Sequence, residues 1–438
     1  MRFQFILCTA LVGLLISKRA NAASVNGYSV EDNDNTTEDE EQTPTSNIQP
    51  KCFKQSYQIN AAGDLRELSD CSIISGDILI SGYDDTVLDF GSISHIKGSL
   101  RVHNASSLLR IQGVELNAID GTFGLNSLTS LTSISLPKLE SIDTLEWKVL
   151  PILSLVNLDK GIKHINSVIM SDTSLTGFGG FNVESLKILN INNNRFLERI
   201  ESSVKEVTES FLISANARTL QVSLPNLSWV KSITIKDTSN LNLNNLQIVE
   251  NNAQFINNKF SQLKLPKLKS AGSTLSIINN QNLNKLDFPA LVEIGGGLMV
   301  IDNDQVSDID FFPALKSVGG AIEFQGNIND SQMEQLRIVK GSAIMKSSSS
   351  NFDCNKWINY EVSGVVRGGK IECGSGNSTV TEVLLVDEAG DITRGAPGVN
   401  SRINDDYSTD IRSGSATLVL SMVTVIAGLI ISGTLMVI

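Results

Sequence analysis

The sequence has few of the residues on which enzymes depend. Its 438 residues include only three histidines, His95, His103 and His164. His95 and His164 occupy matching places in two repeated segments, SISHI and GIKHI, which favours a structural role. No HExxH, P-loop, GxSxG or dinucleotide-binding motif occurs. We therefore expect no catalytic residue, no cofactor and no metal site, and we predict that the protein is not an enzyme.

Aromatic residues are also scarce, at 5% of the chain. Proteins that bind sugars often stack them on exposed aromatic rings, whereas Trp147, Trp229 and Trp357 lie in segments that favour packing. A glycosidase would need two facing carboxylates about 5 to 10 Å apart. Acidic residues are numerous, but they fall at variable, surface-facing positions, and no pair stands out.

Positive charge is in short supply as well. The chain has 35 Lys and Arg against 47 Asp and Glu, a formal net charge of −12. Removal of a leader that carries Arg2, Lys18 and Arg19 would take away three positive charges and bring the net charge to about −15. This is the charge that partners of the mature chain would meet. Nucleic-acid binding needs basic side chains to neutralise phosphates, so we expect no nucleic-acid partner.

Cysteine is limited to five residues, and Cys8 lies in the N-terminal apolar run. The other four form two pairs, Cys52 with Cys71 and Cys354 with Cys373, each separated by 19 positions. An even number in an exported chain indicates disulfides. Three connectivities are possible, and proximity favours the two local ones. Zinc binding is the alternative, although neither pair has the close C-x-x-C spacing of metal sites.

The N-terminus has the parts of a secretory signal peptide. Met1-Arg2 is followed by an apolar run from Phe3 to Ile16 and by Ala20-Asn21-Ala22. We predict a signal peptide over residues 1–22, with an uncleaved anchor as the alternative. The acidic, polar residues 23–50 should form a disordered leader.

The C-terminal residues from Thr417 to Ile438 contain no charge. A membrane-spanning helix is one interpretation, but no basic residue follows the run. A removable tail preceded by small residues is the signal for a glycosylphosphatidylinositol (GPI) anchor. We expect attachment at Ser413 or Gly414, removal of residues 414–438, and a polar linker over 376–413. The membrane would then be contacted through the lipid alone.

A repeat runs through the middle of the chain, with the pattern apolar-x-apolar-Pro-x-Leu-x-x-apolar. Its prolines are spaced by multiples of roughly 22 residues, which is typical of stacked solenoid coils. Five copies are ISLPKLESI (134–142), VSLPNLSWV (222–230), LKLPKLKSA (263–271), LDFPALVEI (286–294) and IDFFPALKSV (309–318).

Clusters of asparagine precede many units, and short segments of alternating polarity flank them. Asparagine suits turns because it tolerates left-handed φ, and stacked asparagines can form ladders. We predict a mostly β fold, a right-handed parallel β-helix with leucine-rich character over residues 51–375, with about 13 to 15 coils of roughly 22 to 24 residues. Helical repeats fit badly with the period of two. The cysteine pairs would stabilise the two ends.

Five Asn-x-Ser/Thr sequons are candidate N-glycosylation sites on an exported chain. They begin at Asn35, Asn104, Asn226, Asn329 and Asn377.

The repeats with asparagine-rich turns resemble the receptor L-domain, the leucine-rich β-helix of growth-factor receptor ectodomains. The segments Phe352-Asp353-Cys354-Asn355-Lys356-Trp357 and Gly364 to Cys373 resemble the C-terminal cap of the fungal GPI-anchored cell-wall organisation glycoproteins. The resemblance covers residues 52–376 and both terminal signals. Residues 376–413 hold only scattered Ser and Thr, which resembles the sporulation-specific branch with its short stalk.

The resemblance implies a non-enzymatic glycoprotein on the cell surface, at the outer leaflet or in the wall. It implies a role in cell-wall organisation and, for the sporulation branch, in assembly of the ascospore wall. It carries over no catalytic residue. A surface receptor for wall polysaccharide such as β-glucan is the alternative, with other wall proteins as further partners. A wall-remodelling glucan transglycosylase is the less favoured third hypothesis.

Overall fold

The structure, a computed structural model, describes residues 49–179, 181, 183–376 and 381–396. The chain divides into two compact units, residues 1–47 and 48–438, and the described residues all belong to the second. The predicted signal peptide, the leader up to residue 48, Asn35, Asn377, Ser413 and Gly414 lie outside the described residues.

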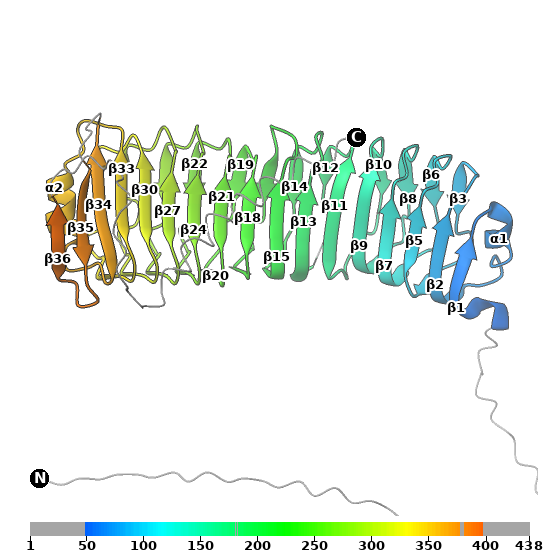
Figure 1. The fold of residues 1–438 in the computed structure, drawn as a ribbon. Coiled ribbons are helices and arrows are strands. Elements are labelled where there is room, and N and C mark those ends of the chain that lie inside the picture. Colours follow the sequence, from blue (N-terminus) through cyan, green and yellow to red (C-terminus); the bar gives the residue numbers. More distant parts are fainter. Residues whose placement is uncertain (1–48, 180, 182, 377–380, 397–438) are drawn as a thin grey trace, which may run out of the picture. The chain divides into compact units, whose positions relative to one another are not determined.

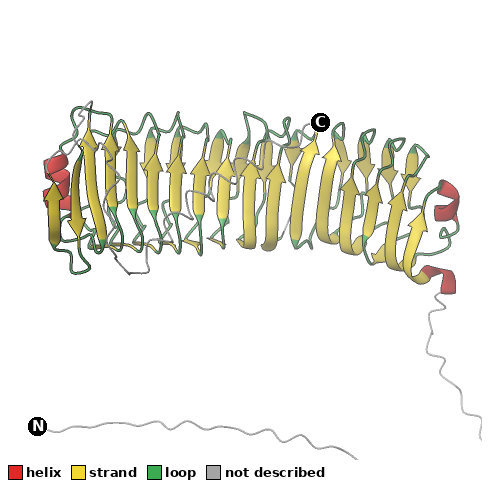
Figure 2. Ribbon diagram, viewed as in Figure 1, coloured by secondary structure: helices red, strands yellow, loops and turns green. Residues whose placement is uncertain are grey.

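The described chain is mostly β and winds into a parallel β-solenoid of about 13 turns, as predicted (Figures 1 and 2). One wall is a 24-stranded sheet whose strands pair with the coils before and after them. Its strands are β1 (Phe53–Ile59), β2 (Ile73–Ser81), β4 (His95–Lys97), β5 (Leu100–His103), β7 (Ala118–Asn126), β9 (Ser141–Leu150), β11 (Ser167–Thr173), β13 (Ser185–Asn192), β15 (Glu206–Ser214), β17 (Trp229–Val230), β18 (Ile233–Lys236), β20 (Ile248–Val249), β21 (Ala253–Ile256), β23 (Ser270–Ala271), β24 (Leu275–Ile278), β26 (Glu293–Ile294), β27 (Leu298–Ile301), β29 (Ser317–Val318), β30 (Ile322–Gly326), β32 (Ile338–Val339), β33 (Ala343–Ser347), β34 (Gly369–Ser375), β35 (Glu382–Val386) and β36 (Ile392–Ala396).

Shorter strands form the opposite wall, in two four-stranded and two two-stranded parallel sheets. They are β3 (Val87–Asp89), β6 (Arg110–Gln112), β8 (Ser133–Ser135) and β10 (Leu155–Asn157); β12 (Gly177–Phe178), β14 (Arg199–Glu201), β16 (Gln221–Ser223) and β19 (Asn240–Asn242); β22 (Gln262–Lys264) and β25 (Lys285–Asp287); β28 (Asp308–Ile309) and β31 (Asp330–Ser331). Helical turns lie near the ends: η1 (Pro50–Cys52), α1 (Ala62–Arg66), α2 (Cys354–Lys356) and the π-helical η2 (Trp357–Val362).

The register explains the repeat read from the sequence. Leu275 pairs with Leu298, and Leu298 pairs with Ile322 in the next coil. These partners are 23 and 24 positions apart, close to the expected period. The coil from Ile233 to Ala253 is shorter, because its paired residues are only 20 positions apart.

Alternation along each strand sends every second side chain inward. Ile277, Val300 and Phe324 pair with one another in register and are at most 2% exposed. Burial of such a side chain stabilises the fold by about 1.5 to 3 kcal/mol, so the stacked apolar columns supply most of the stability. A single coil could not bury its own face, and each therefore depends on its neighbours.

Both predicted disulfides are present, and each joins positions near one end of the solenoid. Cys52–Cys71 and Cys354–Cys373 each have a Cα–Cα distance of 5.7 Å. At the C-terminal end, β35 pairs antiparallel with β34, and β36 pairs antiparallel with β35. This hairpin lies inside the stretch 376–413, for which the sequence reasoning anticipated no strand.

A corner follows each long strand, and two consecutive residues there have opposite roles. The first has a left-handed backbone, with φ of +55° at both Asn193 and Asn279. The second points inward, as the fully buried Asn194 and Asn280 do. The expected preference of asparagine for left-handed turns and for ladders is thus divided between the two members of each Asn-Asn pair.

The inward residues form a ladder of hydrogen bonds across the coils. Asn280 Oδ1 accepts from the backbone N–H of Asn258 at 2.8 Å and from its Nδ2 at 3.0 Å. Asn280 in turn donates from its backbone N–H and its Nδ2 to Asn303 Oδ1. A buried amide is costly unless it is paired, and here each amide supplies the partners of the next.

Candidate functional site

One polar hollow lies on the early strands of the long sheet, and we call it the His164 hollow. It has a volume of about 560 Å³, and its polar lining includes Asp120, Ser141, Asp143, Lys163, His164 and Glu184. Buried Ile142, Ile165 and Val183 also line it. The register runs from His95 through Ala118 and Ser141 to His164. The two histidines therefore occupy matching places on coils that are three turns apart, as the sequence indicated.

Several polar groups of the His164 hollow have hydrogen-bonding partners, within the lining or beside it. His95 Nε2 lies 2.6 Å from Asp120 Oδ1. Asn166 Nδ2 donates to Asp143 Oδ1 at 2.7 Å.

Lysine side chains form ion pairs with glutamates at the His164 hollow and beside it. Lys163 Nζ lies 2.9 Å from Glu140 Oε2, and Lys163 lowers the pKa of Glu140 through this hydrogen bond. Glu184 pairs with Lys205. Over the described ranges, no three His, Cys, Asp or Glu residues come together as a group that could hold a metal ion.

A second depression interrupts the corner that carries the asparagine ladder, and loop length is its cause. Three residues, 237–239, connect β18 to β19, and five, 257–261, connect β21 to β22. The flanking coils use six residues, 215–220 and 279–284. The two short loops therefore extend less far from the body of the solenoid than the loops on either side.

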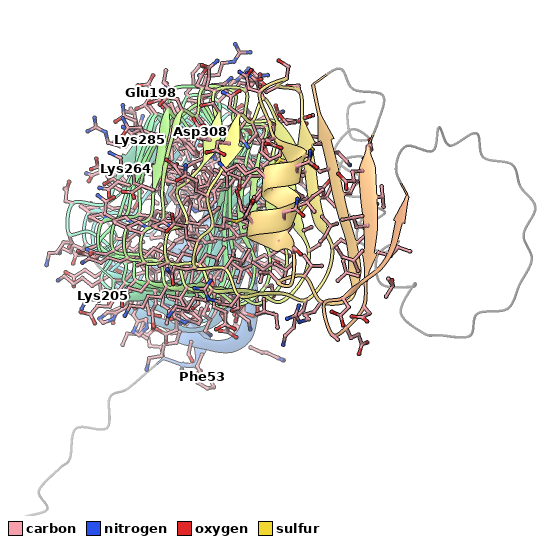
Figure 3. All side chains as sticks on the ribbon, turned by 90° about the vertical axis from the view of Figure 1, so that its left-hand side faces the viewer. Phe53, Glu198, Lys205, Lys264, Lys285 and Asp308 are labelled. Atoms are coloured by element: carbon pink, nitrogen blue, oxygen red, sulfur yellow. A yellow bond between two sulfur atoms is a disulfide. The ribbon has the colours of Figure 1, made fainter. Side chains whose placement is uncertain are left out.

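This depression, which we call the amide notch, comprises two hollows of about 330 and 310 Å³. The lining of the first lies within residues 239–244 and 260–264, and that of the second within residues 237, 257–259 and 279–282. Its amide side chains are those of Asn240, Asn242, Asn244, Asn257, Asn258, Gln262, Asn279, Gln281 and Asn282. Lys264 also lines it, and Figure 3 shows this side chain projecting outward with Lys285 and Asp308 on the short-strand side.

The amides of the notch divide into two groups by their hydrogen bonds. Asn279 Nδ2 donates to Asn257 Oδ1 at 2.6 Å, and Asn242 Nδ2 donates to Ser223 Oγ at 3.3 Å. The side chains of Asn240, Gln262 and Gln281 are exposed and form no hydrogen bond with the described part of the chain. Because their backbones belong to packed coils, these free amides sit on a rigid support.

A third cluster of polar side chains lies at the C-terminal end, where residues of α2 and η2 contact β31. Ser331 Oγ donates to Glu361 Oε2 at 2.8 Å, and Lys356 Nζ lies 2.6 Å from Asp330 Oδ1. Burial raises the pKa of Glu361 to about 7, and the nearby charge of Asp330 adds to the increase. The hydrogen bond that Lys356 Nζ donates to Asp330 lowers the pKa of the Asp330 carboxyl.

The sequons differ in their surroundings. Asn104 and Asn226 are exposed. Asn329 is half-buried, and its Oδ1 accepts a hydrogen bond of 2.6 Å from Ser349 Oγ. Sequence patterns could not separate these sites, because the partner of Asn329 belongs to the next coil.

The expectation that tryptophans pack in the interior holds for two of the three. Trp147 and Trp357 are at most 1% exposed. Trp229 is only partly buried, because it points outward from β17. Trp229 and the exposed Phe53 of β1 are therefore aromatic side chains of the long sheet that reach solvent.

Comparison with known proteins identifies the relatives of this solenoid. Sporulation-specific protein 22 of Saccharomyces cerevisiae is 44% identical over 340 residues, which are 77% of this chain and 73% of that protein. The chain belongs to the same family. The family also includes the cell wall mannoprotein PST1 of Saccharomyces cerevisiae, 36% identical over 74% of this chain and 72% of that protein.

A more distant member is the cell surface GPI-anchored protein ECM33 of Candida albicans, 31% identical over 74% of this chain and 78% of that protein. The family expected from the cap motif is thereby confirmed. No protein-family model and no solved structure matched the chain. Among the helices of the described residues, none has the length and apolar character needed to cross a membrane.

Proposed function

We propose that this protein is a non-enzymatic glycoprotein of the fungal cell surface that organises the wall, and the ascospore wall in particular. The observation that carries this proposal is the similarity to sporulation-specific protein 22 over 77% of the chain, at 44% identity. That extent is comparable to the whole solenoid, so the relationship concerns the entire folded body and not one motif. The names of these relatives state no catalytic activity.

The chemistry of the surface supports a structural role. Three carboxylates of the His164 hollow, Asp120, Asp143 and Glu184, each hold a partner, namely His95, Asn166 and Lys205 in that order, which disfavours them as general acids or bases. A stiff solenoid with a polar exterior and a disulfide near each end is suited to persist outside the cell.

The proposal includes attachment to the outer leaflet by a GPI lipid at Ser413 or Gly414, after removal of residues 1–22. The motif in the sequence supports it, and one relative is named as a GPI-anchored protein. Treatment of intact cells with a phosphatidylinositol-specific phospholipase should release the protein. Mass spectrometry of the released C-terminal peptide then distinguishes Ser413 from Gly414, and a peptide that extends to Ile438 would contradict the anchor.

N-glycosylation is proposed at the exposed Asn104 and Asn226, with Asn35 and Asn377 as further sites. Asn329 should be a poorer site, because its amide is engaged with Ser349. Peptide mapping after deglycosylation in ¹⁸O water measures occupancy at each position. High occupancy at Asn329 would show that the folded contact does not limit modification.

The wall function is tested genetically. The gene should be expressed in Saccharomyces cerevisiae that lacks sporulation-specific protein 22, or deleted from its own host. We expect deletion to weaken the vegetative or the ascospore wall, measured as sensitivity to glucanase, heat and ether, and the intact gene to restore it. Normal vegetative and spore walls in the deletion strain would overturn the proposal.

A further inference from the structure

We propose that the amide notch binds a neutral polysaccharide chain that crosses the asparagine-ladder corner of the solenoid. This inference rests on the proposed function, because it names the kind of wall component that the protein contacts. Its starting observation is the set of free amides at Asn240, Gln262 and Gln281, which face outward from adjacent coils around the shortened loops 237–239 and 257–261.

The notch has the shape that a chain-like ligand requires. Its lining comes from two successive coils, through residues within 237–244 and 257–264, and from the six-residue loop 279–284 of the next coil. The three free amides belong to successive coils, and neighbouring coils are separated by about 4.8 Å, the spacing of paired strands. Both hollows are open to solvent, and a polymer could therefore continue beyond them on either side.

The side chains suit hydroxyl groups rather than ions. An amide offers a donor and an acceptor side by side, which matches a sugar hydroxyl that both donates and accepts. The carboxylate of Asp237 in the notch already accepts a hydrogen bond at Oδ2 from the Ala215 N–H. Lys259 and Lys264 add positive charge at the rim of a strongly acidic protein. No like-charged cluster in the notch would select an anionic or cationic polymer.

The floor also offers apolar surface. Half-buried Leu241 lines the notch, and Phe260 lies buried beside it. Ligand sites commonly combine an apolar floor with a few fixed polar groups, and the C–H face of a sugar ring can rest on such a floor. The His164 hollow is larger, but its amide and carboxylate groups already bond to one another, so a ligand would have to displace those bonds.

The test uses the full chain, expressed in yeast and extracted from the cell surface in detergent. It is passed over insoluble β-glucan, chitin and immobilised mannan at physiological salt, and the dissociation constant is measured for each. Binding to one of these neutral polymers is expected, and the three arms identify which one. Retention by none of them would overturn the inference.

The deciding variant is Asn240→Ala/Gln262→Ala/Gln281→Ala. Its matched control is Asn117→Ala/Gln335→Ala/Asn355→Ala, which removes three exposed amides that form no side-chain hydrogen bond with the described residues and lie away from the notch. The notch variant should bind at least about tenfold more weakly, since several hydrogen bonds are lost, and the control should bind as the parent does. Both should keep the parent melting temperature.

Equal affinity of the notch variant and the parent would overturn the assignment of the site. The wall function is scored separately, by complementation of the deletion strain. If the parent restores the wall but binds no polysaccharide, the inference fails and the proposed function stands. If deletion leaves the wall unchanged while the notch still binds glucan, the proposed function fails and the site stands.

Discussion

The same corner of the solenoid is built in two ways along its length. In the early coils the inward position after the left-handed residue is apolar, as at Ala105, Leu128 and Leu150. In the later coils it is polar, and the residues are Thr173, Asn194, Asn216, Thr238, Asn258, Asn280 and Asn303. Both versions are buried, and both follow a backbone of positive φ.

The difference shows that one backbone geometry can be stabilised by packing or by a polar ladder. A leucine needs only apolar neighbours, and it can be exchanged for another apolar residue of similar volume. An asparagine needs hydrogen-bonding partners on the neighbouring coils, because a buried amide with unsatisfied groups is costly. The amide half of the corner is therefore more specific in sequence than the apolar half.

The largest effect is expected from exchanging the two corner types. Asn280→Leu would leave the Asn258 N–H and the Phe255 carbonyl without their partners, and should reduce the free energy of unfolding by about 3 to 5 kcal/mol. Leu128→Asn would bury an amide between apolar neighbours and should destabilise by a similar amount. Urea unfolding measures both, with Asn117→Ala as the control. A loss below about 1 kcal/mol for either variant would contradict this account.

A smaller effect is expected at the ends. Cys354→Ser/Cys373→Ser and Cys52→Ser/Cys71→Ser each open a loop defined by a 19-residue separation, so each pair should cost about 3 kcal/mol. Secreted yield and melting temperature are the measurements. Equal losses would show that the ends depend on chain constraint. Unchanged secretion and melting temperature for the C-terminal variant would refute its role as a cap.

The left-handed residue itself provides a finer comparison. Val149 has φ of +55°, which is unfavourable for a β-branched side chain, whereas Asn279 has the same φ with a suitable one. Val149→Asn should stabilise the protein by about 1 kcal/mol, and Asn279→Val should destabilise it by about 1 to 2 kcal/mol. Thermal unfolding of both variants checks the sign. A destabilised Val149→Asn would indicate that packing of Val149 outweighs its backbone strain.

The smallest effect concerns pH. Glu361 has a pKa of about 7 in the folded protein, above its ordinary value, because burial disfavours the charged form. The folded state thus holds this proton more tightly, and the protonated carboxyl favours folding below the ordinary pKa of a glutamate. That contribution should decline as the pH rises through about 7. Between the ordinary pKa of a glutamate and about pH 7, Glu361→Gln should flatten the dependence of melting temperature on pH. An unchanged slope would contradict the raised pKa of Glu361.

Much of the fold could be predicted from local patterns. Alternating polarity, the Pro-x-Leu repeat and the 19-residue cysteine spacings each involve residues within one coil, and they predicted the solenoid and its disulfides. The hairpin of β35 and β36 was missed because residues 376–413 read as a polar linker. Only the open edge of β34 gives those strands a partner. The half-exposed Trp229 was missed because one-residue register decides the face.

The sequence by itself determined the coil, since in-and-out alternation and turn residues act over a few neighbours. It also determined the family, through the repeats and the cap motif. Only the tertiary structure decided that Asn280 lies inside while Asn279 lies outside, because their partners are one coil away. It likewise decided where the amide notch lies, since a shortened loop leaves a depression only where longer loops are stacked beside it.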